Sequence, residues 1–533
     1  MAGINALNCS KLIASITRQE VLFMQDAPSS FWMASTPGTD YPEIQQDLQV
    51  DTAIVGGGIV GITTAYLLKK QGMKVAIIEA DRILQGTTGH TTAKITSQHS
   101  LIYARLKQQI GQEMAQQYAD ANESAIHLIA STAAENNIDC DFSWRPAYVF
   151  AQSDKYMKDL EDEAQAACSL GIKASCMDHS PLPFSVRAAL RFDNQAQFHP
   201  LKYLKSLARQ IPGQGSCIFE RTTAVGIDEN PLAVITRQGQ KVTAAKIIIA
   251  SHFPFFDGGG LYFTKLNPTR AYIVAIKAQE KLPEGMFINA ESPSRSLRSQ
   301  PYEEGELILV AGESHQAGSG RNMNAHYQNL LDFAHGNFEV KEVLYRWSTQ
   351  DYRTLDGIPY VGHLTSKSPH IYVATGFGKW GISNGTASAM VLSDLITRGD
   401  SPWAQVYNPS RFNLTAAKTF VGLNLNIGKN LAAGKISRLP EGVELSNGEG
   451  RAIQIDGEKY GAFRDDNGEL HIVDITCTHL GCELNWNDAE QTWDCPCHGS
   501  RFNYTGEVVE GPAFNILHPA DQCPNAVEAR VFE

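Results

Sequence analysis

The sequence lacks a run of apolar residues long enough to cross a membrane, since no segment approaches the ~18 consecutive apolar residues that a spanning helix requires. It also lacks an excess of basic charge, because 45 Lys and Arg face 57 Asp and Glu and the formal net charge is −12. This balance argues against nucleic acid as a partner. Residues 1–25 lack the apolar core of a signal peptide. We therefore expect a cytoplasmic protein with no transmembrane segment.

Cysteine is scarce, with ten residues in 533, and it is unevenly spread. Four cysteines crowd into residues 477–497 with two histidines beside them, and such crowding indicates a metal site. Others occur singly, which is typical of reduced and mostly buried thiols. These single cysteines are Cys9, Cys140, Cys168, Cys176 and Cys217.

The length of 533 residues is too great for one hydrophobic core, so we expect about three domains. Hydrophobic residues make up 43% of the chain and charged residues 19%, which is typical of a globular protein and not of a disordered one.

A dinucleotide-binding unit stands near the N-terminus. Residues 51–55 form a short apolar strand, residues 56–61 read Gly-Gly-Gly-Ile-Val-Gly, and a helix is expected over residues 62–71. A second strand, residues 75–78, ends at Glu79. This strand–turn–helix–strand context makes the G-x-G-x-x-G pattern far more specific than the three glycines alone.

Each position of this unit has an expected role. Gly56 makes the tight turn, Gly58 lets the backbone approach a pyrophosphate, and Gly61 lets the helix pack on the strand. The helix N-terminus offers amide donors to the phosphates. Glu79 is placed to accept hydrogen bonds from a ribose diol, and its charge disfavours the 2′-phosphate of NADP. The candidate contacts are Gly56, Gly58, Ile59, Val60, Gly61, Glu79 and Ala80.

The fingerprint does not separate FAD from NAD, but later segments favour a flavin. Residues 86–94 form a loop of small residues that would wrap around the cofactor. Farther on, a strand over residues 371–375 runs into glycine-rich residues 376–381, which open a helix over residues 382–396. Such a helix aims amide donors at the C2 carbonyl of an isoalloxazine ring. The candidate contacts here are Thr87, Thr88, His90, Thr91, Gly357, Gly376, Gly378, Gly381 and Ile382.

From Ser30-Phe-Trp-Met to Ile396, these motifs and the Gly357-Ile-Pro turn resemble the D-amino-acid-oxidase superfamily, in its glycine-, sarcosine- and gamma-glutamylputrescine-oxidase branch. The resemblance implies bound FAD and a mixed sheet that covers the flavin, and the strands expected over residues 144–151 and 265–276 fit such a sheet. It implies oxidation of a C–N bond by hydride transfer to the flavin, giving an imine that water hydrolyses.

His90 lies in the segment Gly86-Thr-Thr-Gly-His90. This segment is similar to a loop of dimethylglycine- and sarcosine-dehydrogenase relatives, in which a histidine is bonded covalently to the flavin. The resemblance suggests a covalent link between His90 and the flavin. The alternative is a histidine that only hydrogen-bonds the cofactor or packs in the loop.

From about residue 429 the sequence turns to short β-prone runs with turn signals, which predict a small all-β domain. It contains Cys477-Thr-His479-Leu-Gly-Cys482 and Cys495-Pro-Cys497-His498-Gly-Ser. Two thiolates and two imidazoles on two loops suit a [2Fe–2S] cluster. Zinc is the alternative, because it also takes Cys and His.

The paired Cys-x-His loops resemble the Rieske family. That resemblance implies a [2Fe–2S] cluster held by Cys477, His479, Cys495 and His498. It also implies a disulfide between Cys482 and Cys497, which ties the two loops together in the respiratory-chain type.

The expected architecture is an α/β FAD-binding Rossmann-type domain with an α+β mixed-sheet substrate domain, followed by a small all-β Rieske domain. Residues 1–29 would form an extension, and residues 30–140 the first part of the FAD-binding domain. Residues 141–350 would be mostly substrate domain, with about 200–255 returning to the FAD domain. Residues 351–400 would complete the FAD domain, 401–428 would be a linker, and 429–533 the Rieske domain.

The expected function is an FAD-dependent amine or amino-acid dehydrogenase or oxidase. Electrons would pass singly from the flavin to the cluster and on to an external acceptor, a protein or a quinone. One alternative is an NAD(P)H-dependent reductase of the Rieske or ferredoxin type, but the only other glycine cluster, residues 258–260, lacks a strand–turn–helix frame. A second alternative is a non-catalytic electron-transfer partner.

Four residues are nominated for the substrate site. Arg270 would pair with a substrate carboxylate and Tyr272 would hydrogen-bond beside it, although a salt bridge within the protein is the plainer role for the arginine. Lys379 and Trp380 should lie near the flavin, where Lys379 either approaches flavin N5 or is merely solvated.

Overall fold

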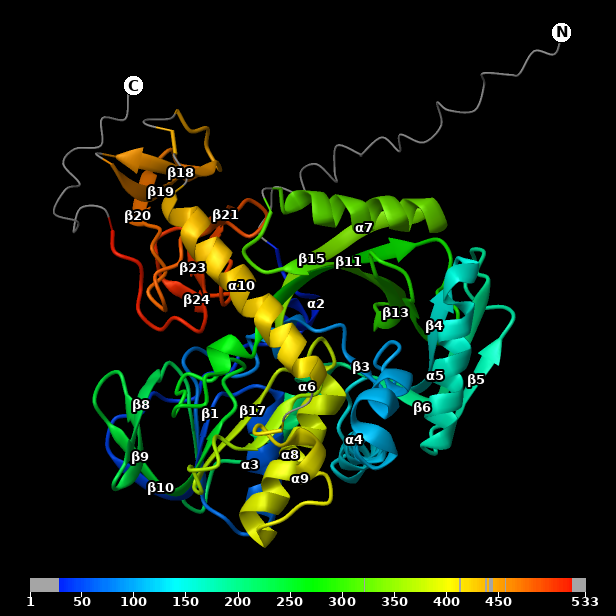
Figure 1. Cartoon of the computed structure of the whole chain (residues 1–533), viewed down its shortest axis with the longest axis horizontal. Helices are drawn as coiled ribbons and strands as arrows, with labels where there is room; N and C mark the ends of the chain where they lie inside the picture. The colour runs from blue at the N-terminus through cyan, green and yellow to red at the C-terminus, as the bar shows by residue number, and fades with distance from the viewer. Residues whose placement is uncertain are drawn as a thin grey trace.

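The computed structural model describes residues 28–320, 322–411, 414–436, 439–440, 444–455 and 457–519. Most of the predicted N-terminal extension, residues 1–29, lies outside these ranges, as does Cys9. Two large sheets with their helices form the body of the molecule, and the C-terminal strands form a smaller unit at one end (Figure 1). In the described ranges no helix has the length and apolar character to cross a membrane.

The first sheet has eight strands around a parallel centre. The strands run in the order β16 (Tyr360–His363), β17 (Ile371–Thr375), β10 (Lys241–Ile249), β1 (Leu48–Val55), β2 (Val75–Ile78) and β7 (Cys217–Phe219), with β8 (Ala224–Glu229) and β9 (Leu232–Thr236) beside β10. All four residues of β2 are buried, as expected for a strand covered on both faces. The associated helices are α3 (Ile59–Lys70), α4 (Tyr103–Glu135), α6 (Pro200–Ala208) and α8 (Gly381–Arg398).

The second sheet has nine strands of mixed direction, as the predicted substrate domain requires. Its order is β15 (Val340–Arg353), β11 (Asn267–Ala278), β14 (Gly305–Gln316), β13 (Arg295–Tyr302), β12 (Met286–Asn289), β4 (Ser143–Ala151), β6 (Ala188–Gln197) and β3 (Lys94–Ile95), with β5 (Ala174–Met177) on β6. Helices α5 (Met157–Ser169) and α7 (Asn324–Asn337) pack on this sheet. The short elements are α2 (Phe31–Ala34), η1 (Thr87–His90), η2 (Asp154–Tyr156), η3 (Tyr262–Thr264) and α9 (Ala404–Tyr407).

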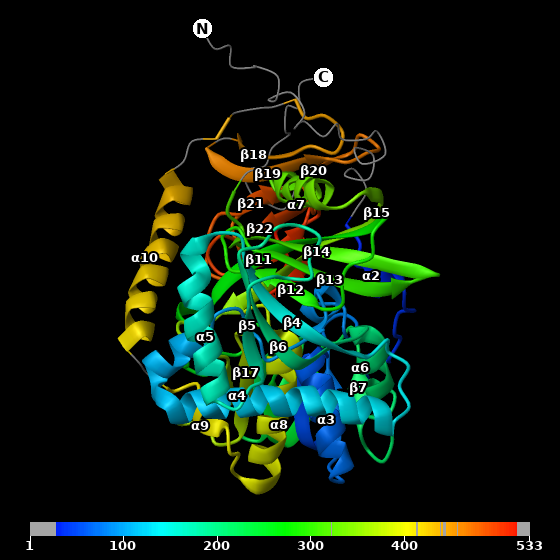
Figure 2. The same cartoon turned by 90° about the vertical axis from the view of Figure 1, so that its right-hand side faces the viewer.

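The predicted linker, residues 401–428, is largely helical. Helix α10 (Leu414–Ile436) runs through the predicted boundary at residue 429 and reaches the C-terminal unit (Figure 2). Its side chains bond to both units. Asn424 Nδ2 donates to the Thr264 carbonyl at 3.1 Å, and Asn430 Nδ2 donates to the Pro496 carbonyl at 3.2 Å. The connection is therefore a packed helix.

The C-terminal unit consists of two small sheets. One contains β18 (Gly450–Ile455), β19 (Glu458–Arg464) and β20 (Leu470–Asp474), and the other contains β21 (Asn485–Asn487), β22 (Thr492–Asp494), β23 (Arg501–Asn503) and β24 (Val508–Glu510). Trp493 and Phe502 are fully buried at the centre of the second. A Cβ on Gly461 would lie 2.4 Å from the Trp493 ring, so glycine makes room for the indole. The prediction of a small all-β domain is confirmed.

The prediction that the single cysteines are mostly buried is wrong for two of the four that are described. Cys140 is buried and Cys217 is partly buried, but Cys168 and Cys176 are exposed. Cys168 lies outside the buried face of α5, which is formed by residues such as Leu160 and Ala167. The isolated position of a cysteine in the sequence therefore does not predict its burial, which depends on the face of the helix or strand that it occupies.

Candidate active site

A cavity of about 750 Å³ lies beyond the carboxyl ends of β1 and β2, between the two large sheets. It is lined by Gly56, Gly58, Ile59, Val60, Glu79, Ala80, Thr87, Thr88, Thr91, Gly381 and Ile382, all of them predicted cofactor contacts. Of the other predicted contacts, Gly61 and His90 do not line it, while Gly357, Gly376 and Gly378 line a neighbouring cavity. We refer to the first space as the FAD cavity.

Glycine is required where β1 turns into α3. Gly56 has a φ of +110°, and a Cβ there would lie 2.4 Å from the Ala250 carbonyl oxygen. A Cβ on Gly61 would lie 1.9 Å from the Gly56 carbonyl oxygen. Both distances are shorter than atoms tolerate, so only glycine brings the first turn of α3 this close to β1. The turn thereby opens onto the cavity at the place that a pyrophosphate requires, and in this respect the residues fit FAD.

Glu79 is held at the edge of the FAD cavity by backbone amides. Its Oε2 accepts a hydrogen bond from the Gly57 N–H at 2.7 Å, and its Oε1 accepts one from the Asp81 N–H at 3.1 Å. Burial raises the pKa of Glu79, and the amide hydrogen bonds act against that rise. The carboxylate is thus fixed among the lining residues, and its contact with a ribose stays a prediction.

His90 ends the short helix η1, but its ring does not line the FAD cavity. Nδ1 lies 2.9 Å from the Gly86 carbonyl oxygen, and the His90 carbonyl accepts a hydrogen bond from Trp347. Burial lowers the pKa of this imidazole. The threonines on either side of His90 reach the cavity, so the covalent flavin link stays a prediction that this arrangement does not favour.

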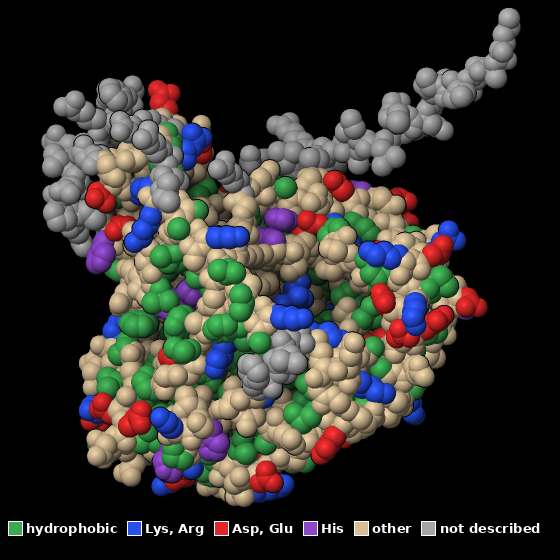
Figure 3. All heavy atoms as spheres, viewed as in Figure 1, with side chains coloured by type: hydrophobic (Ala, Val, Ile, Leu, Met, Phe, Trp, Pro, Cys, Tyr) green, Lys and Arg blue, Asp and Glu red, His purple; other side chains and the backbone are tan. Residues whose placement is uncertain are grey.

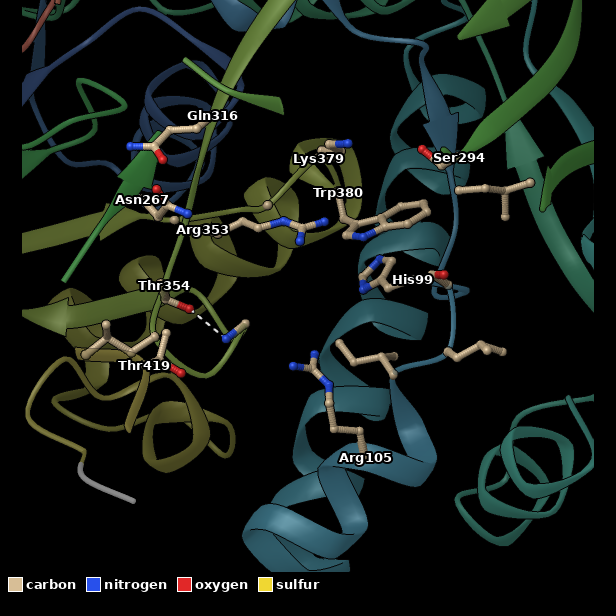
Figure 4. A pocket seen from close by; sticks show the side chains of 18 of the residues that line it. His99, Arg105, Asn267, Ser294, Gln316, Arg353, Thr354, Lys379, Trp380 and Thr419 are labelled. Carbon is tan, nitrogen blue, oxygen red and sulfur yellow. Dashed lines mark hydrogen bonds between the residues drawn. The ribbon is translucent and has the colours of Figure 1, made fainter. Parts of the chain in front are cut away.

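A second cavity of about 830 Å³ adjoins the first (Figure 4). Ile288, Ser294, Lys379 and Trp380 line both spaces. The Trp380 ring stacks on His99 with their centroids 4.9 Å apart, and the pair forms one wall. The second cavity therefore opens beside the FAD cavity at Lys379 and Trp380, the two nominated residues that lie near the expected flavin.

Lys379 occupies an unusual backbone position. Its φ is +81°, in the left-handed region, where a residue with a Cβ costs about 1–2 kcal/mol. Its N–H donates to Asp351 Oδ2 at 2.7 Å, which holds the turn in this conformation. Burial, together with the charge of Arg353, lowers the pKa of Lys379 to about 7. The amine therefore titrates near neutral pH on the wall between the two cavities.

The nominations of Arg270 and Tyr272 as substrate residues are wrong. Arg270 is fully buried, and its Nη2 lies 3.5 Å from Asp494 Oδ2 in the C-terminal unit. The Tyr272 hydroxyl lies 3.0 Å from His315 Nε2, and neither residue lines either cavity. The reason is strand alternation: Thr269, Ala271 and Ile273 line the FAD cavity, so the residues between them face the other side of β11.

The predicted cluster ligands meet on two loops of the C-terminal unit. The thiols of Cys477 and Cys495 are buried and hydrogen-bonded to one another, and this bond lowers the pKa of Cys477 to about 7. The rings of His479 and His498 lie with their centroids 4.9 Å apart. Nδ1 of His479 and both ring nitrogens of His498 are buried without a hydrogen-bond partner in the described structure. Two facing thiols and two histidines with unpartnered nitrogens fit a [2Fe–2S] cluster.

Two further contacts support these loops. Cys482 and Cys497 form a disulfide, as the resemblance implied. Ser500 hydrogen-bonds the Cys477 thiol, and its Oγ accepts a hydrogen bond from the Ala513 N–H at 3.0 Å. Hydrogen bonds of this kind orient the ligands of a metal site and tune it.

The cluster loops pack against the flavin-binding body. The Tyr352 hydroxyl donates to the His498 carbonyl at 3.3 Å and lies 3.1 Å from the Gly511 carbonyl oxygen, while Gln350 Nε2 donates to the Gly499 carbonyl at 2.7 Å. Residues 507–514, together with Ile516, form part of the wall of the FAD cavity. No motif in the sequence indicated that the C-terminal unit would complete this wall.

Buried charges join the two units. Arg270 and Arg501 both reach Asp494, and although burial alone would raise the pKa of this carboxyl, the two guanidinium groups hold it below its usual range. His252 lies between Asp351 of the body and Glu510 of the C-terminal unit, at 3.2 and 3.5 Å. Burial opposes protonation of His252, but the two carboxylates outweigh it and raise the pKa to about 9.

Two family models match the sequence. A model described as FAD dependent oxidoreductase, DAO, covers residues 51–395, and a model described as Rieske [2Fe-2S] domain covers residues 438–520. The Rieske match starts at residue 438, just after α10 ends at Ile436, whereas the predicted domain starts at residue 429.

Some relatives match nearly the whole chain and others match about 70% of it. The Rieske-containing protein YhfW of Bacillus subtilis is 43% identical over 503 residues, covering 94% of this chain and 99% of the relative. Gamma-glutamylputrescine oxidoreductase of Escherichia coli is 22% identical and covers 71% of this chain and 90% of its own. The glycine oxidase structure from Geobacillus kaustophilus superposes with a TM-score of 0.59 at 19% identity, covering 68% of this chain and 99% of that one, which shows a shared fold.

The flavin-binding match takes in more than half of the chain, and the donor set of the C-terminal loops agrees with the second model. The chain belongs to the DAO family of FAD-dependent oxidoreductases and carries a C-terminal Rieske [2Fe–2S] domain.

Proposed function

We propose that the protein oxidises a C–N bond of an amine or amino acid in the second cavity. The FAD would accept the hydride of the substrate, and the Rieske cluster would pass single electrons to an external acceptor, a protein or a quinone. One observation carries the proposal: Lys379 and Trp380 lie in the wall that the second cavity shares with the FAD cavity, and residues of the Rieske domain form another part of the FAD cavity wall.

Lys379 is the group that would manage the substrate proton. An amine must lose its ammonium proton before the C–N bond can be oxidised, and an Nζ with a pKa near 7 accepts a proton at neutral pH. Trp380 and His99 would restrict the substrate to one side of this wall. The residues thus bind, orient and deprotonate the substrate, and leave the redox step to the cofactor.

The route to the cluster is short and runs through aromatic residues. Phe253 lines the FAD cavity, and its ring centroid lies 6.0 Å from the ring of the cluster ligand His479. Tyr352 packs on the cavity residue His252 at 4.7 Å and bonds to the backbone of the cluster ligand His498. Both contacts support electron transfer within one chain, where the tether gives a high effective concentration.

The two alternatives have less support. A nicotinamide reductase needs a second dinucleotide site, but residues 258–260 lead into the three-residue turn η3 and then into β11, with no helix of the required kind. A non-catalytic carrier has no use for a cavity beside the flavin that is lined by basic side chains such as Arg105, Arg353 and Lys379.

An anaerobic titration tests the proposed function. We expect an amine or amino acid from a panel of primary and secondary amines to bleach the flavin absorbance, and the EPR signal of a reduced Rieske cluster to follow. NAD(P)H in the same panel should produce neither change. Reduction by NAD(P)H alone would replace the proposal with the reductase.

Replacing Lys379 with Met should lower the rate of flavin reduction by roughly 10²-fold or more, the usual range for loss of a general base. In the parent enzyme the rate should rise with pH through about 7, because the amine must be neutral to accept a proton. Stopped-flow absorbance from pH 6 to 8.5 would show this rise, and it should vanish in Lys379→Met. The exposed Lys367→Met is the matched control, and an unchanged pH profile in Lys379→Met would refute the role.

A further inference from the structure

Two arginines, Arg105 and Arg353, line the second cavity. Arg353 ends β15 and Arg105 lies in the first turn of α4, and Figure 4 shows both guanidinium groups pointing into the same space. Within the described ranges neither makes an ion pair, and Arg105 Nη1 donates a hydrogen bond to the Asp356 carbonyl at 3.3 Å. The Asp356 carboxylate is taken by Arg411 at 2.8 Å, so it does not neutralise Arg105.

The two positive groups influence one another. Burial lowers the pKa of Arg353, the negative charge of Asp351 acts against this shift, and the positive charge of Arg105 lowers the pKa further. Like charges that share a cavity without ion pairs are costly unless an anion binds there, and the one carboxylate in the lining, Glu291, accepts hydrogen bonds from backbone N–H groups instead. Gly357 has a φ of +82°, and a Cβ at this position would lie 2.8 Å from Arg105 Nη2, so the glycine makes room for the guanidinium. The fold therefore places both positive groups at the cavity, whose wall also contains Lys379.

Two unpartnered acceptors lie in the same wall. Asn267 Oδ1 and Glu291 Oε2 are buried without a hydrogen-bond partner in the described structure, and both residues line the second cavity. The other oxygen of Glu291 accepts hydrogen bonds from the backbone N–H groups of residues 152 and 153, which fixes the carboxylate in place. Buried acceptors of this kind need donors, and a ligand with N–H groups supplies them.

Helix α10 closes one side of this cavity with uncharged residues. Thr419, Gly422, Leu423 and Asn426 line it, and they add no acid that would neutralise the arginines. The face viewed in Figure 3 has a hollow near its middle with Lys and Arg side chains at its edge. On the α10 side, the cavity therefore presents no charge that would repel an anion.

We propose that the substrate carries two anionic groups, as an amino dicarboxylate does, with Arg353 and Arg105 each pairing with one of them. The substrate N–H groups then face the acceptors Asn267 and Glu291. Each guanidinium matches a carboxylate in a bidentate manner, which distinguishes two carboxylates from one. This inference rests on the proposed function, because it places the oxidised amine in the second cavity.

Binding of non-oxidisable acids tests the inference without turnover. Full-length, FAD-loaded protein is titrated with glutarate and with valerate, which has the same chain length but one carboxylate, and the shift of the flavin absorbance gives each dissociation constant. We expect glutarate to bind at least about tenfold more tightly than valerate, the effect of one charge-assisted pair. Arg353→Met and Arg105→Met should each weaken glutarate binding by about 10–100-fold and remove most of the preference for glutarate over valerate. Lys367→Met should change neither.

Equal affinity for the two acids, or an affinity that neither arginine substitution changes, would overturn the inference. Rapid flavin reduction by an amine without acidic groups, unaffected by Arg353→Met, would overturn it too and leave the proposed function standing. Tight glutarate binding in a protein whose flavin no amine reduces would instead remove the proposed function.

Discussion

In the variant His479→Ala, substrate should still reduce the flavin, but electrons should not reach a one-electron acceptor. The substitution removes the imidazole of a proposed cluster ligand, whose Nδ1 has no hydrogen-bond partner in the described structure. The ring packs on Phe253 and lines neither cavity. Loss of a supporting contact alone costs metal sites about 10–100-fold, so loss of a ligand should leave the acceptor rate below about 1% of the parent. Anaerobic stopped-flow absorbance measures flavin reduction, an acceptor assay measures electron delivery, and iron analysis measures how much of the cluster is retained.

Leu480→Ala is the matched control for this variant. Leu480 follows His479 in the same loop and is 49% exposed, so its truncation should retain iron and the Rieske EPR signal. Flavin reduction that falls together with acceptor reduction in His479→Ala would mean that the cluster supports the fold of the flavin site. Acceptor reduction that continues at the parent rate would contradict the relay.

Replacing Arg270 with Met should destabilise the docking of the Rieske domain on the flavin-binding body. Arg270 and Asp494 are both buried, and removing one partner of a buried ion pair typically costs about 3–5 kcal/mol. Arg501 still reaches Asp494 at 3.3 Å, so we expect the lower end of this range. The loss should appear as a lower unfolding temperature and as slower passage of electrons from flavin to cluster, with the rate of flavin reduction little changed.

The exposed pair Arg191 and Asp193 offers a matched comparison. These side chains are 38% and 41% exposed, and such surface pairs contribute about 0–1 kcal/mol. Arg191→Met should therefore leave the unfolding temperature and the electron-transfer rate nearly unchanged. Equal effects of the two substitutions would show that the buried pair does not hold the domains together.

Local patterns predicted the elements of the flavin-binding body well. The strands predicted over residues 75–78 and 371–375 have the same bounds in the structure, and the helix predicted over residues 382–396 is α8. These elements depend on residues that are close together in sequence. An apolar run predicts each buried strand, and glycines mark the turns that follow residues 55 and 375. The cluster loops were predictable for the same reason, because ligand spacing is a local property.

Apart from Lys379 and Trp380, the proposed substrate site was not predictable in this way, because its other residues come from distant elements. Arg105 and Arg353 meet across 248 positions of sequence, and nothing near either residue marks it as part of a cavity. Arg270 was misassigned because a strand shows alternate residues to opposite faces, and the sequence does not say which face meets the flavin. The linker predicted over residues 401–428 takes in most of α10, because Pro402, Pro409 and the Asn and Ala residues of this segment are typical of a connection.

The most direct test of the central claim is the kinetics of cluster reduction after the flavin is reduced. Anaerobic protein is mixed with a reducing amine, frozen at intervals, and examined by EPR over a roughly tenfold range of protein concentration. Transfer within one chain predicts a rate of cluster reduction that does not depend on protein concentration, since the Rieske domain forms a wall of the FAD cavity. A rate that rises in proportion to protein concentration, or a cluster that stays oxidised beside reduced flavin, would contradict the account.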